Sequence, residues 1–508
     1  MINSAYTQLV GEAPPEGGHY ITVWAPRQTG KTWVVQEAVQ KIKKTNDYEV
    51  GIFSMGAVKK EKNEQEVIAA FVDQLSVVFQ KEFPPLKKIR HIPILFTKKY
   101  FQKPVILIID EFDSLEEDFI NEFANIFREI FSSRSNEPDK KSKDKTHLIH
   151  GLALVGVRSV LGIENVTGSL FNVQRSLHIP NLTHEEIHLM FKWYEEESRQ
   201  TVETNVIDRL FYETNGQPGL CGWFGELLTE TYNKEKNSAI TGDHFEEVHA
   251  AAVKILPNNN ILNIISKADK EPYKQTVLEL FKTDRKMEFT YDNKKLNYLY
   301  MNGVIDREKE NRLEYYVKFS CPFVQKRLFN YFSSELFHSM GRLYDPFASL
   351  DNTVTETHLD IKNLVKLYQS YLNKNREWLL KDAPRRKDLR IYEAVYHFNF
   401  YTYLNEFLRT RGGRVFPEFP TGNGKIDLIV TYADNRYGIE IKSYVDERNY
   451  RVSLAKAARY GKQLELPEIF LVFFVESVDD KSRKTYEKDY PDKETGVTVS
   501  PIFVETGN

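Results

Sequence analysis

The chain has 508 residues, of which 41% are hydrophobic, and a formal net charge of −3. This length predicts about three or four domains, and the charge argues against a protein that is basic over its whole surface, as a nucleic-acid coat would be. The two cysteines, Cys221 and Cys321, imply no disulfide framework, and no Cys/His cluster has zinc spacing. With no signal-peptide pattern and no apolar run of roughly 18–20 residues, we expect a cytoplasmic protein without membrane contact.

The first motif reads Ala-Pro-Arg-Gln-Thr-Gly-Lys-Thr, after an apolar strand expected at 20–24 and before a helix expected at 32–44. Backbone N–H groups of such a loop, together with the helix N-terminus, cradle the phosphates of a nucleoside triphosphate. Lys31 is expected at the β- and γ-phosphates, and the Thr32 hydroxyl is expected to bind Mg²⁺. The sequence therefore predicts ATP contacts at Ala25, Pro26, Arg27, Gln28, Thr29, Gly30, Lys31 and Thr32.

Ala25 is the one departure from this pattern, which has glycine there. Alanine is the smallest residue after glycine, so the loop is expected to keep its conformation unless that position requires a positive φ.

Strands and helices alternate over the first third of the chain. The strands are continuous apolar runs, as in a parallel sheet buried on both faces. They are expected at 48–53, 104–109 and 151–157, with helices at 63–81 and 115–131. The polar residues 134–147 are expected to form a mobile loop.

Two carboxylates, Asp110 and Glu111, follow the strand at 104–109. Asp110 is expected to hold Mg²⁺ through water, and Glu111 is expected to polarise the attacking water. The separation from Lys31 leaves room for an intervening strand, so the two strands could be neighbours. Arg158, after the next strand, is either a γ-phosphate sensor or a surface arginine.

The turn Asn215-Gly216-Gln217-Pro218-Gly219 lies between two expected helices. One interpretation is an ordinary helix cap and turn. The other is that Gln217 and Pro218 pack on the nucleotide base.

The middle of the chain has a helical pattern over 181–256, and short helices with an alternating strand over 274–332 suit a small winged-helix module. The expected class is a multidomain α/β protein. Its parts are a P-loop core at 1–180, a helical lid at 181–256, a winged-helix-like module at 257–340, a helical linker at 341–387 and an α/β domain at 388–508.

A second motif joins Gly424-Lys425-Ile426-Asp427 to Glu440-Ile441-Lys442 through an expected hairpin. The hairpin brings Asp427 beside Glu440, and Lys442 shares the face of Glu440 because residues i and i+2 of a strand point the same way. Carboxylates bind Mg²⁺, which lowers the pKa of a bound water and neutralises charge on a scissile phosphate. Lys442 can orient that water or stabilise the transition state.

Three other residues are candidates for this site. Glu393 and Glu418 compete for the role of a further metal ligand, and Gln463 could reach the site by a hydrogen bond. The alternative is that alternating Glu and Lys form an ordinary solvated strand face. The order of helix 388–409, strands, helix 451–464 and strand 469–474 favours the nuclease interpretation. Nearby basic residues could contact phosphates or form a solvated surface: Arg385, Arg386, Lys387, Arg409, Arg411 and Arg414.

Both motifs resemble known families. The Pro26–Thr32 loop, the Asp110-Glu111 strand and the Gly216-Gln217-Pro218 turn are similar to bacterial AAA-like ATPases related to the signal-transduction class. The segment from Glu393 to Lys442 resembles the PD-(D/E)xK nuclease superfamily, in the version fused to such ATPases. Gly-Lys-Ile rather than Pro precedes Asp427, as is common in that superfamily. The resemblance implies Mg²⁺-dependent cleavage of DNA or RNA and a role in mobile elements or in defence against foreign nucleic acid.

Three functions remain open. The leading hypothesis is an ATP-controlled nuclease with ATP and Mg²⁺ as cofactors and nucleic acid as partner. A second is an ATPase switch whose last domain binds nucleic acid without cutting it. A third is a signalling ATPase that forms a homo-oligomer and recruits a partner, with the nuclease-like fold as scaffold.

Overall fold

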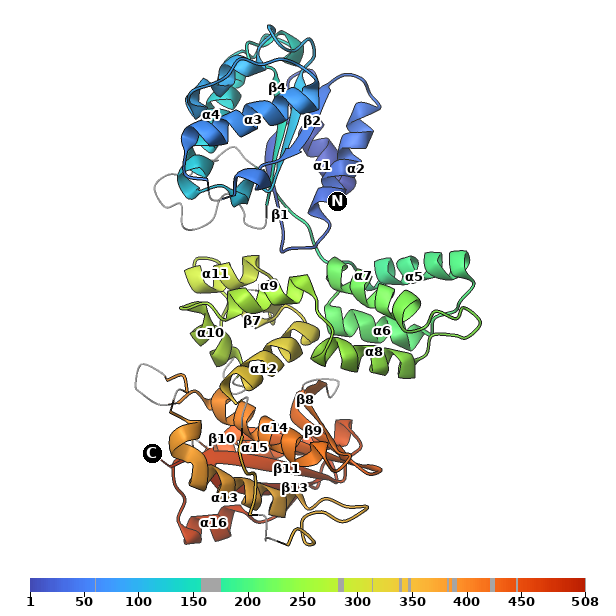
Figure 1. Cartoon of the computed structure of the whole chain (residues 1–508), viewed down its shortest axis with the longest axis vertical. Helices are drawn as coiled ribbons and strands as arrows, with labels where there is room; N and C mark the ends of the chain where they lie inside the picture. The colour runs from blue at the N-terminus through green and yellow to red at the C-terminus, as the bar shows by residue number, and fades with distance from the viewer. Residues whose placement is uncertain are drawn as a thin grey trace.

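The structure is a computed structural model, which describes residues 1–59, 61–156, 175–281, 287–312, 314–337, 340–345, 349–381, 383–385, 391–420, 425–444 and 446–507. Figure 1 shows three tiers: an α/β domain, a pair of mostly helical units, and a second α/β domain. Arg158 lies outside the described residues. None of the helices in the described ranges is long and apolar enough to cross a lipid bilayer.

The N-terminal domain is built on a five-stranded parallel sheet with the order β2-β3-β4-β1-β5. Its strands are β1 (Tyr20–Trp24), β2 (Glu49–Ser54), β3 (Val105–Asp110), β4 (Ile149–Gly156) and β5 (Arg175–His178). β1 and β4 are buried throughout, as expected for strands covered on both faces. The predicted parallel sheet is confirmed. β4 lies between β1 and β3, however, so the strands that precede Lys31 and Asp110 are not neighbours.

Helices cover both faces of this sheet and form two separate cores. The helices are α1 (Ile2–Val10), α2 (Lys31–Lys43), α3 (Glu64–Phe79) and α4 (Glu117–Ser135), with 3-10 helices η1 (Gly56–Val58), η2 (Ile89–Phe96), η3 (Phe112–Ser114) and η4 (Ser142–Asp144). α3, α4 and η2 build one core, and α1 and α2 build the other. The sequence did not predict α1 or β5, and β5 contains one apolar residue in four.

Residues 134–147, expected to form a mobile loop, begin in α4 and are tied to this domain by hydrogen bonds. The buried Arg134 donates hydrogen bonds to the His147 carbonyl and to Ser142 Oγ at 2.6 Å. Ser142 Oγ lies 2.6 Å from Nδ1 of the buried His150. Three polar residues of this segment, Arg134, Ser142 and Lys145, are therefore buried, while most of the others are exposed.

The middle tier has two units side by side in Figure 1. The first consists of α5 (His184–Ser198), α6 (Thr204–Thr214), α7 (Pro218–Glu226), the π-helical turn η5 (Leu227–Thr231) and α8 (Gly242–Lys254). The second consists of α9 (Asn259–Ala268), α10 (Tyr273–Leu280), α11 (Lys294–Met301), the antiparallel pair β6 (Ile305–Lys309) and β7 (Tyr315–Phe319), and α12 (Pro322–Leu336). The short helices and the strand β7 agree with the prediction, whereas its partner strand β6 was not predicted.

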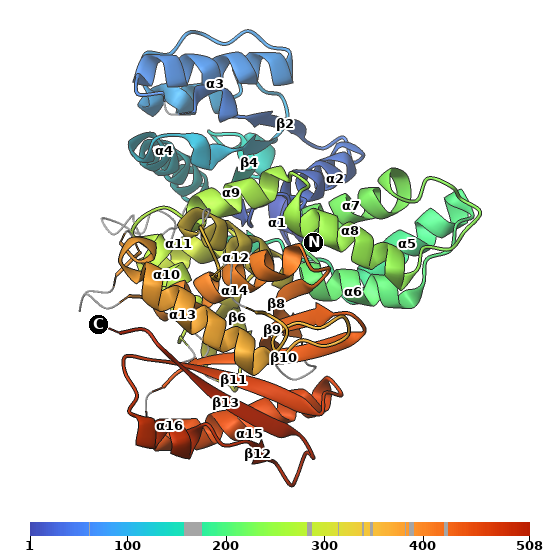
Figure 2. The same cartoon turned by 60° about the horizontal axis from the view of Figure 1, so that its bottom comes forward.

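The C-terminal domain has a six-stranded mixed sheet with the order β12-β13-β11-β10-β9-β8. Its elements are α13 (Ile361–Leu379), α14 (Glu393–Arg409), β8 (Arg414–Pro420), β9 (Lys425–Tyr432), β10 (Asn435–Ser443), α15 (Glu447–Gln463), β11 (Glu468–Val475), α16 (Asp480–Tyr486), β12 (Tyr490–Pro491) and β13 (Thr498–Glu505). β8, β9 and β10 are antiparallel, and β11 joins β10 in parallel after the α15 crossover. Figure 2 shows α13 and α14 on one face of this sheet, and α15 and α16 on the other.

One hydrophobic core links the middle tier to the C-terminal domain. It runs from Ile187 in α5 through Phe329 in α12 to Phe398 in α14 and Val472 in β11. The cores of the N-terminal domain are separate from it.

Candidate functional site

The loop between β1 and α2, called the phosphate loop below after its predicted ligand, has two left-handed residues just before the helix. Gly30 precedes α2 with a φ of 79°, a left-handed conformation that glycine adopts at no steric cost. Gln28 is also left-handed, with a φ of 56°. Ala25 is buried and is not among the described residues with positive φ, so this position does not require glycine.

Lys31 folds back onto this loop. Its Nζ donates hydrogen bonds to the carbonyl oxygens of Ala25 at 2.8 Å and Pro26 at 2.6 Å. Burial lowers the pKa of Lys31 to about 8, with a further lowering by Arg27 and opposing contributions from Asp113 and Asp110. The amine is therefore held at the loop, where a phosphate would replace the two carbonyls as its partner.

Thr32 and the end of β3 meet although β4 separates their strands. The Thr32 hydroxyl donates to Asp110 Oδ2 at 2.7 Å. Ser54, at the end of β2, donates to Glu111 Oε2 at 2.5 Å. The sequence did not single out Ser54, although the sheet register pairs it with Asp110. Thr32 and Asp110, the predicted Mg²⁺ ligands of this site, and Glu111, the predicted water-polarising carboxylate, thus lie together at the carboxyl ends of the strands.

The turn before α7 contacts the backbone of the phosphate loop. Gln217 Nε2 donates to the carbonyls of Arg27 at 3.0 Å and Gln28 at 3.2 Å. The Gly219 N–H donates to the Gln28 carbonyl at 2.9 Å. A Cβ on Gly219 would lie 2.5 Å from Gln28 Cβ, so this approach requires glycine. Pro218 is the first residue of α7, and contact of this turn with a base stays a prediction.

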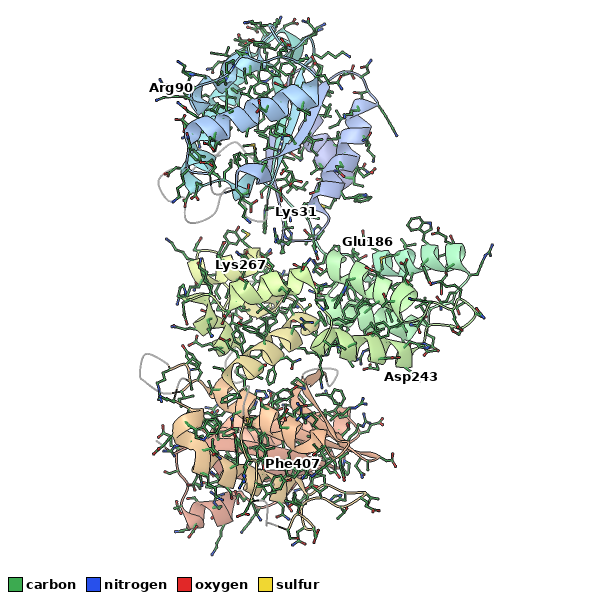
Figure 3. All side chains as sticks on the ribbon, in the orientation of Figure 1. Lys31, Arg90, Glu186, Asp243, Lys267 and Phe407 are labelled. Carbon is green, nitrogen blue, oxygen red and sulfur yellow. The ribbon has the colours of Figure 1, made fainter. Side chains whose placement is uncertain are left out.

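The unit that contains β6 and β7 reaches the same loop from another side. A Cβ on Gly303 would lie 3.1 Å from Pro26 Cβ, and the Tyr300 ring lies 6.1 Å from the Trp24 ring. Figure 3 shows Lys31 at the junction between the upper tier and the middle tier. The phosphate loop is therefore a contact between the N-terminal domain and both middle units.

The second candidate site lies in the C-terminal domain. Lys442 Nζ is 3.0 Å from Glu440 Oε1 and 3.9 Å from Asp427 Oδ2. The β9–β10 register produces this cluster, because it pairs the adjacent residues Leu428 and Ile439. Asp427, Glu440 and Lys442 are 2%, 1% and 2% exposed, so they do not form the solvated strand face that was the alternative.

Glu440 has a perturbed pKa. Burial and the nearby Asp427 raise the pKa of Glu440 to about 7, against opposing effects of Lys442 and Lys456. Glu440 Oε1 faces the Lys442 ammonium group, whereas Glu440 Oε2 has no hydrogen-bond partner among the described residues. Asp427 Oδ2 accepts the Ile441 N–H at 2.6 Å. Two buried carboxylates, one of them with an oxygen that lacks a hydrogen bond, are the hard donors that Mg²⁺ prefers. The residues therefore fit this cation.

Two residues near this cluster were not predicted. Lys456 of α15 places Nζ 3.8 Å from Glu440 Oε1, whereas Gln463 is exposed at the end of the same helix. Lys456 and Gln463 are seven positions apart in α15, which is about two helical turns, so they lie on the same face of the helix. Helical periodicity alone therefore does not distinguish them. His397 of α14 is buried, and burial together with the charge of Lys442 lowers its pKa to about 3.

The two competing acidic residues remain predictions. Glu393 begins α14 and Glu418 lies in β8, but the side chains of both lie outside the described part of the structure.

No protein-family model matches the chain, and no curated protein matches it in sequence. Solved structures do match. The ORC1 protein of Aeropyrum pernix in complex with DNA is 14% identical, with a TM-score of 0.35 over 65% of this chain and 91% of that one. A Walker-type ATPase of Pyrococcus abyssi is 15% identical, with a TM-score of 0.36 over 61% and 90%. The RuvB Holliday junction branch migration motor of Thermotoga maritima is 14% identical, with a TM-score of 0.32 over 59% and 84%. At these identities and TM-scores, function has to be inferred from the geometry of this chain itself.

Proposed function

We propose that this chain is an ATP-binding and ATP-hydrolysing protein whose C-terminal domain is a Mg²⁺-dependent nuclease controlled by the nucleotide state. The observation that carries the proposal is the meeting of Asp427, Glu440 and Lys442 from two adjacent strands, with both carboxylates within 3.9 Å of Lys442 Nζ. In this proposal the first domain is an AAA-like ATPase and the last is a PD-(D/E)xK nuclease. The proposed domain boundaries are those expected from the sequence, except that α13, expected in the linker, packs on α14 of the last domain.

The N-terminal residues have distinct proposed roles. Lys31 exchanges the carbonyls of Ala25 and Pro26 for phosphate oxygens, and the N–H groups at the start of α2 bind the same phosphates. Thr32 and Asp110, already 2.7 Å apart, would hold Mg²⁺, and Glu111 orients the attacking water. Bound Mg²⁺ would neutralise charge on the β- and γ-phosphates.

The C-terminal residues fit phosphodiester hydrolysis. Asp427 and Glu440 would hold Mg²⁺, which supplies Lewis-acid polarisation of the phosphate and a more acidic water. Lys442 holds its ammonium group between the two carboxylates and is positioned to stabilise negative charge that develops on the phosphate. The Ile441 N–H fixes Asp427 in the required orientation through its 2.6 Å hydrogen bond.

One observation favours the second candidate function, an ATPase switch that binds nucleic acid without cutting it. The three residues are at most 2% exposed, so a phosphodiester reaches them only after a neighbouring segment moves. In the nuclease proposal, nucleotide binding causes that movement. In the second candidate, the cluster stays closed and serves the stability of the domain.

The experiment is incubation of the purified full chain with labelled DNA and RNA, in single- and double-stranded form, with and without ATP and Mg²⁺. We expect Mg²⁺-dependent cleavage that changes with ATP and is lost in Asp427→Ala and Lys442→Ala. Asp434→Ala is the matched control, because Asp434 is exposed at the turn of the same hairpin. Lys31→Ala is expected to remove the ATP response. Binding of nucleic acid without cleavage in every condition would favour the second candidate.

A further inference from the structure

A cluster of metal-binding side chains lies on the helical unit, away from both sites described above. His184 and His188 are four residues apart in α5, so their side chains leave the same face of the helix. Asp208 faces them from α6. One ligand atom from each residue can be chosen so that all three lie within 4.8 Å of one another.

The two imidazoles converge on a single carboxylate oxygen. Asp208 Oδ1 lies 2.8 Å from His184 Nε2 and 3.9 Å from His188 Nε2. Ligands of a tetrahedral zinc ion lie about 3.3 Å apart, since each is about 2.0–2.1 Å from the metal. The two observed distances fall on either side of that value. Small side-chain rotations would therefore bring both distances to that value.

The local structure already orients these ligands. Thr183 and Glu186 form a capping box that fixes the first turn of α5, which carries His184. The His184 ring packs edge-on against Phe211 of α6, with 5.2 Å between ring centres. The three ligands are 40%, 35% and 54% exposed, so a metal ion can reach them and water can complete its coordination.

We propose that His184, His188 and Asp208 form a transition-metal site of the zinc class that joins α5 to α6. Two imidazoles and one carboxylate suit Zn²⁺, whereas Mg²⁺ prefers oxygen ligands alone. This inference does not depend on the proposed ATPase or nuclease activity.

The site lies behind the turn that contacts the phosphate loop. The residues just before α5 bond to those just after α6: Asn181 Nδ2 donates to the Asn215 carbonyl at 2.9 Å, and Leu182 N–H donates to the Gly216 carbonyl at 2.8 Å. The next residue is Gln217, which donates to the loop carbonyls. A metal ion that holds α5 against α6 would therefore stabilise the position of the turn that contains Gln217.

The test is calorimetric titration of the full, nucleotide-free chain with Zn²⁺ in the presence of Mg²⁺. We expect one site per chain whose affinity falls by at least about tenfold in His188→Ala and in Asp208→Asn. His91→Ala is the matched control, because His91 adjoins Arg90 in the upper tier of Figure 3, away from this unit. Asp427→Ala tests whether Zn²⁺ instead occupies the second candidate site, and its affinity is expected to stay unchanged.

Thermal unfolding gives an independent readout. Zn²⁺ is expected to raise the unfolding temperature of the natural chain, because a ligand that binds only the folded state stabilises it. The increase is expected to disappear in His188→Ala and persist in His91→Ala. Equal Zn²⁺ affinity in the natural chain and His188→Ala, or loss of binding in Asp427→Ala, would overturn the proposal.

Discussion

Burial at the phosphate loop shifts the pKa of Lys31 toward neutral pH. Its pKa falls to about 8 because it is buried, while Asp113 and Asp110 only partly oppose this change. An unfolded lysine has a pKa of 10.5. Phosphate oxygens would favour the ammonium form, so the pKa of Lys31 with ATP bound must lie above that of the free protein. Nucleotide binding is therefore linked to proton uptake at alkaline pH.

The first prediction concerns ATP affinity as a function of pH. Near and below pH 7 Lys31 is protonated before binding, so this residue should contribute no pH dependence to the affinity there. Above pH 8 binding must add a proton, so affinity should fall by up to about tenfold per pH unit until the pKa of the bound state is reached. Calorimetric titration at pH 7, 8 and 9 measures this change. Lys31→Arg is the control, because arginine stays charged. Equal affinities at pH 7 and 9 in the natural chain would contradict the linkage.

The second prediction separates the two lysines of the C-terminal cluster. Lys442 is 2% exposed and lies near both carboxylates, whereas Lys456 is 33% exposed and reaches Glu440 Oε1 at 3.8 Å. Lys442→Met should lower the cleavage rate by about 10²–10³, the cost of removing one fixed group that stabilises a transition state. Lys456→Met should cost about fivefold or less, since a partly exposed ion pair contributes little. Single-turnover cleavage at saturating Mg²⁺ measures both. Equal losses would show that Lys442 has no special role.

At the scale of elements, the start of α7 can approach the phosphate loop closely because its second residue, Gly219, has no side chain. Gly219 approaches Gln28 so closely that a Cβ would lie 2.5 Å from Gln28 Cβ. Gln28 is itself left-handed, and its carbonyl accepts hydrogen bonds from Gly219 and Gln217. A change at Gly219 must therefore move either the turn or the loop.

The third prediction compares two glycines of α7. Gly219→Ala should weaken ATP binding by about tenfold or more, because the added methyl group displaces Gln28 and the loop that cradles the phosphates. Gly222→Ala is the matched control, since nothing lies within 4 Å of the Cβ that it adds. Alanine there should leave ATP affinity unchanged and stabilise the helix by up to about 1 kcal/mol. Calorimetric titration and thermal unfolding provide the two measurements. The same ATP affinity in both variants would refute the proposed role of this turn.

Elements with a local signal could be predicted from the sequence. β3 and its terminal Asp110 follow from one apolar run, and the β9–β10 hairpin brings Asp427 to Glu440 through a short connection. Strand order could not be predicted in the same way. β4 enters between β1 and β3 because of long-range pairing, which leaves no trace in the spacing of Lys31 and Asp110.

Contacts between distant elements also left little sequence signal. α13 was expected to link domains, yet Tyr368 at its centre is fully buried and packs on Phe400 of α14 and near Phe474 of β11. His184 and His188 did not suggest a metal site, since a third ligand is provided only when α6 brings Asp208 beside α5. In both cases the contacting residue comes from another element, so the sequence pattern of one helix does not reveal the contact.

At the scale of the whole molecule, the distribution of hydrophobic cores predicts which parts move together. The helical unit, the unit with β6 and β7, and part of the C-terminal domain share one core. The C-terminal domain has a further core that includes α15, and the N-terminal domain has two cores of its own. Contacts between these bodies include those at the phosphate loop, from Gln217, Gly219 and Gly303. A change in this loop on ATP binding would therefore act on the middle tier and the C-terminal domain as one body.

Phe329 of α12 is central to this shared core. It is fully buried, and its ring lies 5.0 Å from His397, 4.8 Å from Phe398 and 5.0 Å from Tyr401, all on α14. His397 in turn lies within electrostatic range of Lys442. Phe329 thus connects the middle tier to the helix beside the candidate nuclease site.

The last prediction is that the protein unfolds in two calorimetric transitions, one for the N-terminal domain and one for the shared body. Phe329→Ala should destabilise the shared body by about 3–5 kcal/mol, the usual cost of removing a buried phenylalanine ring, and leave the other transition in place. Phe71→Ala is the matched variant, because Phe71 is equally buried in a core of the N-terminal domain. It should lower only the other transition. If both variants shift one common transition equally, the chain unfolds as a single unit and the ATP signal cannot pass between two bodies in the way proposed.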